Sequence, residues 1–146
     1  MGKRRIGIGQ IFVIFAILIS GCNFYANRTQ ERLISRVHEY HKLWQLQEWD
    51  KASNLLSNKS PHKSGGMDGY RDEKVSLYKG YTELSYELDR VEYKKTGPAN
   101  VYLELNLANK TKGLHKMDKV EEVWVFERGD WFLKEEKLLE EIEMHR

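Results

Sequence analysis

The feature that most constrains this fold is a change in hydrophobic period near Tyr81 of the 146-residue chain. Before Tyr81, apolar side chains recur every three to four residues, which is the period of a helix with one buried face. After Tyr81 they alternate every second residue, as in strands with one face toward a core. Helices followed by a run of antiparallel strands are typical of an α+β domain, with helices packed on one face of a curved sheet.

The helical part has one strong amphipathic segment and two weaker ones. Thr29 is the predicted N-terminal cap of the strong helix, and Asp50 the predicted cap of a short second helix. A loop is predicted from Ser57 to Arg71, and a short third helix from Asp72 to Lys79. The strong helix presents five residues on one face at offsets of 0, 4, 7, 8 and 11, namely Leu33, Val37, Tyr40, His41 and Trp44.

The first strands of the predicted sheet follow from alternation. The alternation from Leu84 to Leu88 changes parity before Val91, which indicates a bulge after Asp89. A second strand is predicted between the turns at Thr96–Ala99 and Asn109–Gly113. Its buried face consists of Val101, Leu103, Leu105 and Leu107.

The last part of the chain predicts a hairpin and a tail. Val120 to Phe126 is apolar on both faces, which favours a central strand covered on each side. Glu127 to Asp130 is a predicted tight turn, after which Trp131 begins the returning strand. The tail from Glu135 to Arg146 is predicted to form a terminal helix, because Leu138, Leu139 and Ile142 are spaced among glutamates.

The first twenty-two residues have the pattern of an export signal. A basic cluster, Lys3 to Arg5, precedes nine consecutive apolar residues, Ile11 to Ile19, and then Ser20, Gly21 and Cys22. A basic start, a short apolar run and small residues before a break are the signature of a signal peptide. The apolar stretch is shorter than the roughly 20 residues of a permanent transmembrane helix. Residues 1–21 are therefore the predicted signal peptide helix.

The end of this signal, Ile19-Ser20-Gly21-Cys22, resembles the lipobox of bacterial lipoproteins. The resemblance implies diacylglyceryl transfer to the Cys22 thiol, cleavage after Gly21, and acylation of the new amino terminus by a fatty acid such as palmitate. The expected location is then the cell envelope, facing the periplasm or the exterior. Asn23 favours the outer membrane in a Gram-negative cell. An uncleaved signal-anchor and a secretory signal with an incidental cysteine remain as alternatives.

Charge and cysteine content limit what the mature chain does. Removing residues 1–21 takes away three basic side chains, so that 21 basic and 22 acidic side chains remain, a formal net charge of −1. A nearly neutral domain without a basic stripe is not expected to bind nucleic acid. Cys22 is the only cysteine, so no intrachain disulfide forms. The predicted organisation is a tether over 22–28, an α+β domain over 29–135, and a tail or helix over 136–146.

Two segments resemble a known superfamily. Val37–Trp44 with Glu48–Ala52 and Leu55–Ser57 resembles the opening helices of the nuclear transport factor two-like superfamily, and Glu121–Leu133 is similar to its last hairpin. The resemblance implies a cone in which a curved antiparallel sheet wraps a long helix and leaves a pocket. Members include isomerases, dehydratases, small-molecule binders and protein-interaction modules, often dimeric through the sheet. The fold alone therefore excludes few classes of function.

Several residue sets are candidates for a site. The spacing of His38 and His41 suits a metal, but no third ligand is identifiable, so neither a metal nor a cofactor is predicted. The resemblance implies that an enzyme of this superfamily would place a carboxylate inside the cone. Asp89 and Glu104 are the candidates for that carboxylate in this chain. The sequence assigns a catalytic role to neither of them. Aromatic residues form either a ligand pocket or core: Tyr40, Trp44, Tyr86, Tyr102, Trp124 and Phe126.

These observations lead to two hypotheses on function. The first is a non-enzymatic domain, bound to the membrane through lipid on Cys22, which binds an envelope protein, a second copy of itself, or a small apolar ligand. The second is a lipid-anchored isomerase or dehydratase that uses a buried carboxylate. The first expects an interior without buried acids, whereas the second requires a buried Asp or Glu that faces a tyrosine or histidine.

Overall fold

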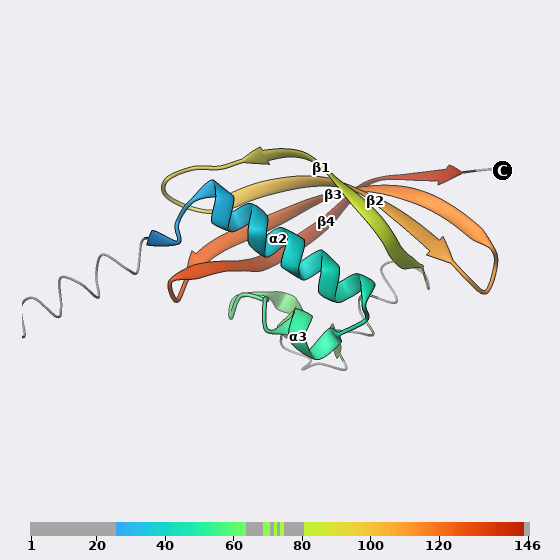
Figure 1. The fold of residues 1–146 in the computed structure, drawn as a ribbon, viewed down its shortest axis with the longest axis horizontal. Helices are drawn as coiled ribbons and strands as arrows, with labels where there is room; N and C mark the ends of the chain where they lie inside the picture. The colour runs from blue at the N-terminus through green and yellow to red at the C-terminus, as the bar shows by residue number, and fades with distance from the viewer. Residues whose placement is uncertain (1–25, 64–68, 71, 73, 75–80, 145–146) are drawn as a thin grey trace, which may run out of the picture.

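A computed structural model of the chain describes residues 26–63, 69–70, 72, 74 and 81–144 (Figure 1). The predicted signal peptide, Cys22 and most of the tether lie outside the described residues, as does much of the predicted third helix. In the described part of the chain, no helix has the length and apolar character needed to cross a membrane.

The described residues form an α+β domain, as predicted. The strands make one antiparallel sheet in the order β1-β2-β3-β4, and α2 lies across one of its faces (Figure 1). The elements are α2 (Gln30–Gln45), α3 (Trp49–Ser53), the 3-10 turn η1 (Pro61–Lys63), β1 (Thr82–Glu92), β2 (Ala99–Asn109), β3 (Leu114–Glu127) and β4 (Asp130–Met144).

The predicted long helix is confirmed, including its cap. The Thr29 side chain accepts a hydrogen bond from the Arg32 amide at 3.1 Å, and all five predicted core residues of α2 are buried. The predicted cap at Asp50 is wrong. The positive φ of Gln47 turns the chain directly after α2, so α3 begins one residue before Asp50, which lies in its first turn.

The sheet follows the predicted alternation in β2, where Val101, Leu103, Leu105 and Leu107 are all buried. The bulge near Asp89 is confirmed by a register shift between Leu88 and Arg90. A second shift, between Glu83 and Ser85, leaves Leu84 49 % exposed. The bulge at Leu84 turns Glu83, Tyr86 and Leu88 toward the helices despite their mixed parity in the sequence.

The predicted terminal helix over Glu135–Arg146 is wrong, because β4 continues to Met144. Its residues pair with β3 along the whole strand, from Glu127↔Asp130 to His115↔Met144. A register shift at Leu139 breaks the strict alternation of a strand, which explains why the sequence suggested a helical spacing.

The strand β3 is central, as predicted, but only one of its faces is covered. Val120, Glu122 and Trp124 are buried toward the helices, whereas Val123 and Val125 remain partly exposed. No described element packs on the second face, which we call the open face. Its middle is formed by Asn100, Tyr102, Glu104 and Asn106 of β2 with Lys119, Glu121, Val123 and Val125 of β3.

Candidate functional site

The described interior contains a histidine held between two glutamates. His41 belongs to the buried face of α2, Glu83 to β1 and Glu122 to β3. The His41 Nδ1 atom lies 2.8 Å from Glu83 Oε2, and its Nε2 atom lies 3.0 Å from Glu122 Oε1. None of the three side chains has any exposed surface. These residues, which we call the His41 cluster, connect the helix to two strands.

The other oxygens of both carboxylates also accept hydrogen bonds. Gln45 Nε2 donates to Glu83 Oε1 at 2.7 Å, and Trp124 Nε1 donates to Glu122 Oε2 at 2.8 Å. The ring of Tyr86 lies over the imidazole of His41, with 4.4 Å between the ring centroids. Because every polar atom of the His41 cluster already has a partner, the cluster has the features of a buried ion-pair network.

The two carboxylates decide the protonation of His41. Burial by itself lowers the pKa of His41, but the negative charge of Glu122 and the hydrogen bonds to Glu122 and Glu83 outweigh burial and raise the pKa to about 10. At neutral pH the ring is therefore an imidazolium that donates from both nitrogens. A histidine in this state is not available as a general base.

We expect His41 to stay protonated well above neutral pH. The ¹⁵N chemical shifts of its ring in the folded protein should remain those of an imidazolium up to about pH 9, because the pKa lies near 10. A midpoint near 6.5, the pKa of a solvated histidine, would contradict the ion-pair description of the cluster.

A second buried pair lies beside the first. Lys74 Nζ is 2.5 Å from Glu136 Oε2 and 4.5 Å from the centroid of the Trp44 ring. The hydroxyls of Tyr40 and Tyr70 are 2.6 Å apart, and burial raises the pKa of Tyr40 well above its ordinary value. The ammonium of Lys74 and the hydroxyl of Tyr70 thus fill the space beside the aromatic rings of α2.

The structure brings only part of the predicted aromatic set together. Tyr40, Trp44 and Trp124 are core residues with at most 2 % exposure, and half-buried Tyr86 adjoins them over His41. Phe126 packs on Trp131, with 5.4 Å between ring centroids. Tyr102 lies on the open face. Core packing, the alternative reading of this set, thus accounts for its three innermost members.

The carboxylates proposed from the sequence lie on the surface. Asp89 is exposed at the bulge of β1, and Glu104 is partly exposed on the open face. There they line a shallow groove of about 310 Å³, in which the Arg90 guanidinium lies 3.8 Å from the centroid of the Tyr102 ring. The groove is lined by Asp89, Arg90, Tyr102, Leu103, Glu104, Lys119, Val120 and Leu139.

Glu83 and Glu122, the buried carboxylates around His41, were not selected from the sequence, and the expectation of an interior without buried acids is wrong. Glu122 did carry a signal, because it shares the buried parity of Val120 and Trp124. Glu83 carried none, since the bulge at Leu84 reverses its parity.

The two neighbouring histidines of α2 do not converge on one point. His38 is exposed, and its Nδ1 atom is hydrogen-bonded to the Tyr86 hydroxyl, whereas His41 is buried between its glutamates. Among the residues that the structure describes, no group of three or more histidine, cysteine or acidic side chains is arranged to hold a metal ion.

No protein-family model matches the sequence, and no curated protein matches it.

Proposed function

We propose that this chain is a lipoprotein of the bacterial cell envelope, anchored by lipid on Cys22, whose domain binds a protein partner across the open face of its sheet without catalysis. The lipobox-like sequence before Cys22 supports the anchor. In a Gram-negative cell Asn23 favours the outer membrane. The order of helices and strands is compatible with a nuclear transport factor two-like domain, a superfamily that includes protein-interaction modules.

One observation carries the choice of a protein partner. The polar atoms of the His41 cluster are all hydrogen-bonded within the interior. The open face, in contrast, holds partly exposed aromatic, aliphatic and charged side chains together. Tyr102, Val123 and Val125 lie there with Lys119 and Glu121. A broad surface of this mixed composition suits a protein interface better than a small ligand. A second copy of the chain and a different envelope protein both fit such a surface.

The open face is a better candidate than the sheet edges. Both edge strands carry bulges, at Leu84 and Asp89 in β1 and at Lys134 and Leu139 in β4. Near the hairpin, β4 is also covered by the segment after α3, since the Ser57 amide donates to the Leu133 carbonyl at 2.7 Å. Bulges and covering segments hinder the addition of a further strand. Side-chain contacts across the open face are therefore the favoured way for a partner to bind.

Site-specific photo-crosslinking in intact cells tests this proposal. A photoreactive phenylalanine analogue in place of Tyr102 should give one discrete crosslinked product, to a second copy or to one envelope protein. The same analogue at Lys42, exposed on α2, is the matched control and should give none. Equal crosslinking from both positions, or none from Tyr102, would contradict binding by the open face.

A second candidate function is an enzyme of the isomerase or dehydratase type. The observation that favours it is the pair of buried carboxylates beside His41 and Tyr86, which is the arrangement such an enzyme requires. Against it stand the complete burial of the His41, Glu83 and Glu122 side chains and the cationic state of His41. The ring titration described above tests whether His41 itself serves as the acid–base group, because that role needs a pKa near neutral pH.

A further inference from the structure

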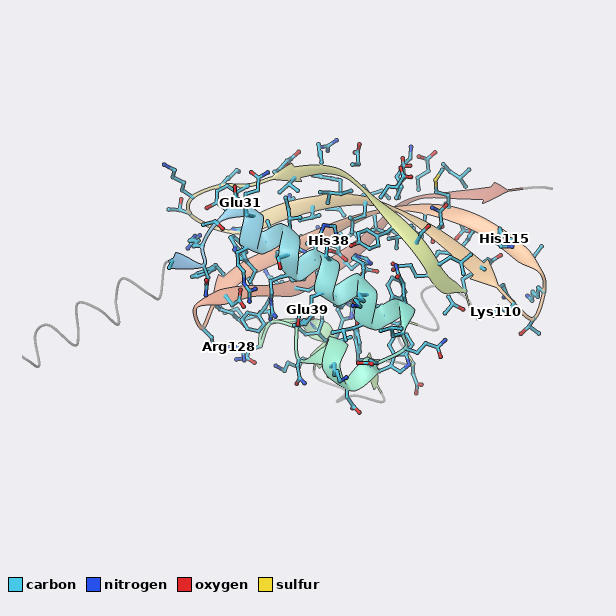
Figure 2. The ribbon with its side chains drawn as sticks, in the orientation of Figure 1. Glu31, His38, Glu39, Lys110, His115 and Arg128 are labelled. Atoms are coloured by element: carbon cyan, nitrogen blue, oxygen red, sulfur yellow. The ribbon has the colours of Figure 1, made fainter. Side chains whose placement is uncertain are left out.

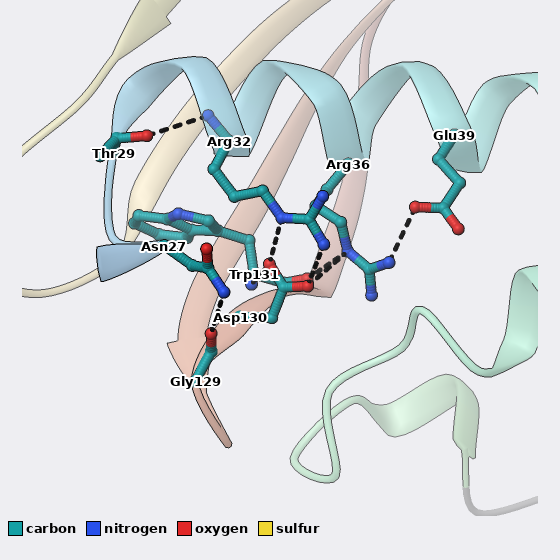
Figure 3. A network of polar contacts seen from close by, with 8 residues as sticks. All are labelled: Asn27, Thr29, Arg32, Arg36, Glu39, Gly129, Asp130 and Trp131. Carbon is teal, nitrogen blue, oxygen red and sulfur yellow. Dashed lines mark hydrogen bonds and ion pairs between the residues drawn. The ribbon is translucent and has the colours of Figure 1, made fainter. Parts of the chain in front are cut away.

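The place where the tether joins the domain is fixed by several contacts. Asn27 Nδ2 donates to the Gly129 carbonyl at 3.3 Å (Figure 3). Arg28 Nη2 donates to the Gly97 carbonyl at 3.0 Å, and the Tyr93 hydroxyl donates to the Arg28 carbonyl at 2.8 Å. Gly97 belongs to the turn between β1 and β2, and Gly129 to the turn between β3 and β4. We call these two turns, with Asn27 and Arg28, the hairpin end.

Packing and ion pairs strengthen the same attachment. The Arg28 guanidinium lies 5.3 Å from the centroid of the Phe126 ring. One turn into α2, Arg32 forms two hydrogen bonds with Asp130, whose carboxylate is also 3.5 Å from Arg36 (Figure 3). The start of α2 is thereby held against the β3–β4 turn.

The short tether places this end near the membrane. If Cys22 is acylated, Asn23 to Arg28 reach at most about 20 Å even when fully extended. The opposite end of the sheet, at the turn between β2 and β3, is about 35 Å away along the 11 residues of β2. Figure 2 shows this separation, with Arg128 at the hairpin end and Lys110 at the other. The lysines between Asn109 and Lys119 thus begin at the far end.

The hairpin end carries two lysines without an ion pair among the described residues and one arginine that is about half exposed. Lys94 and Lys95 are exposed in the β1–β2 turn, and neither forms an ion pair with another described residue. Arg128 is 47 % exposed; it forms an ion pair of 3.4 Å with Glu127, and its guanidinium lies 4.0 Å from the centroid of the Phe132 ring. The nearby acids are engaged, Glu92 by Arg90 and Asp130 by Arg32 and Arg36, while Glu31 remains exposed at the start of α2.

We propose that the hairpin end rests on the anionic headgroups of the anchoring membrane through Lys94, Lys95 and Arg128. This inference rests on the proposed lipid anchor. Headgroup attraction acts within a Debye length of about 8 Å, so it reaches only basic residues that lie at the membrane surface. The strands then run away from the bilayer, and the open face is turned sideways, toward proteins in the same membrane.

Amine labelling of the unmodified sequence tests this orientation. The acylated protein is reconstituted into vesicles of phosphatidylcholine alone or with phosphatidylglycerol, and a water-soluble acetylating reagent is applied. Peptide mass spectrometry then gives the labelling rate of each lysine. Lys94 and Lys95 should react roughly three- to tenfold more slowly on the anionic vesicles, and the difference should disappear at high salt.

Lys110 and Lys112 of the far turn are the internal control and should react equally on both vesicles. Equal rates at Lys94 and Lys95 on both vesicles, or slower labelling at Lys110 and Lys112, would overturn the orientation. The intact mass of the same preparation separates this failure from that of the anchor. If Cys22 carries acyl mass but Lys94 and Lys95 are not protected, the orientation alone is rejected. If the acyl mass is missing, both the anchor and the orientation are rejected.

Discussion

Replacing His41 by alanine is expected to lower the free energy of unfolding by about 3–5 kcal/mol, because Glu83 and Glu122 would remain buried without their counter-charge. That is a large share of the roughly 5–15 kcal/mol that stabilises a typical domain. Urea unfolding followed by tryptophan fluorescence measures the change. Lys42→Ala, at an exposed position of the same helix, is the matched control and should cost less than about 0.5 kcal/mol.

The same residue should make stability depend on alkaline pH. The pKa of His41 is about 10 in the folded protein, compared with 6.5 in a solvated histidine. Because the pKa of His41 is higher in the folded state, its contribution to the free energy of unfolding is fully present below about pH 6.5. That contribution is lost as pH rises through about 10. The free energy of unfolding should fall over this window in the native protein, and the part due to His41 should be absent from His41→Ala. A His41→Ala variant that retains the full alkaline decline would contradict the assignment.

The second large effect is expected from Cys22→Ala. Without the thiol there is no site for the diacylglyceryl group, so the protein should leave the lipid-anchored pool almost completely. Two acyl chains give stable membrane anchoring because each buried CH₂ contributes about 0.8 kcal/mol. Fractionation of cells measures this loss. Ser20→Ala keeps a small residue beside the cleavage point and is the matched control, which should remain anchored.

Local patterns in the sequence predicted most of the architecture. The buried face of α2, the cap at Thr29, the strand β2 and the turn before Trp131 all depend on neighbouring residues, and each is confirmed. The terminal helix was wrong because pairing with β3 and the bulge at Leu139 override the local spacing. The covering of β3 on both faces was wrong because a long apolar run also suits a strand with one open face.

The candidate site was harder to predict because it is built from distant parts of the chain. His41 was placed on the buried face of α2, yet its partners are 42 and 81 residues away. Glu122 could have been found as a charged residue in the buried parity of β3. Glu83 could not, because only the pairing of β1 with β2 reveals the bulge that turns it inward.

The intact mass of the native chain extracted from membranes is the decisive test of the lipid anchor. The expected mature protein begins at Cys22 and carries the mass of a diacylglyceryl group and an added fatty acid. A chain that retains Met1, or one released in soluble form without lipid, would contradict the lipid-anchored envelope protein proposed here.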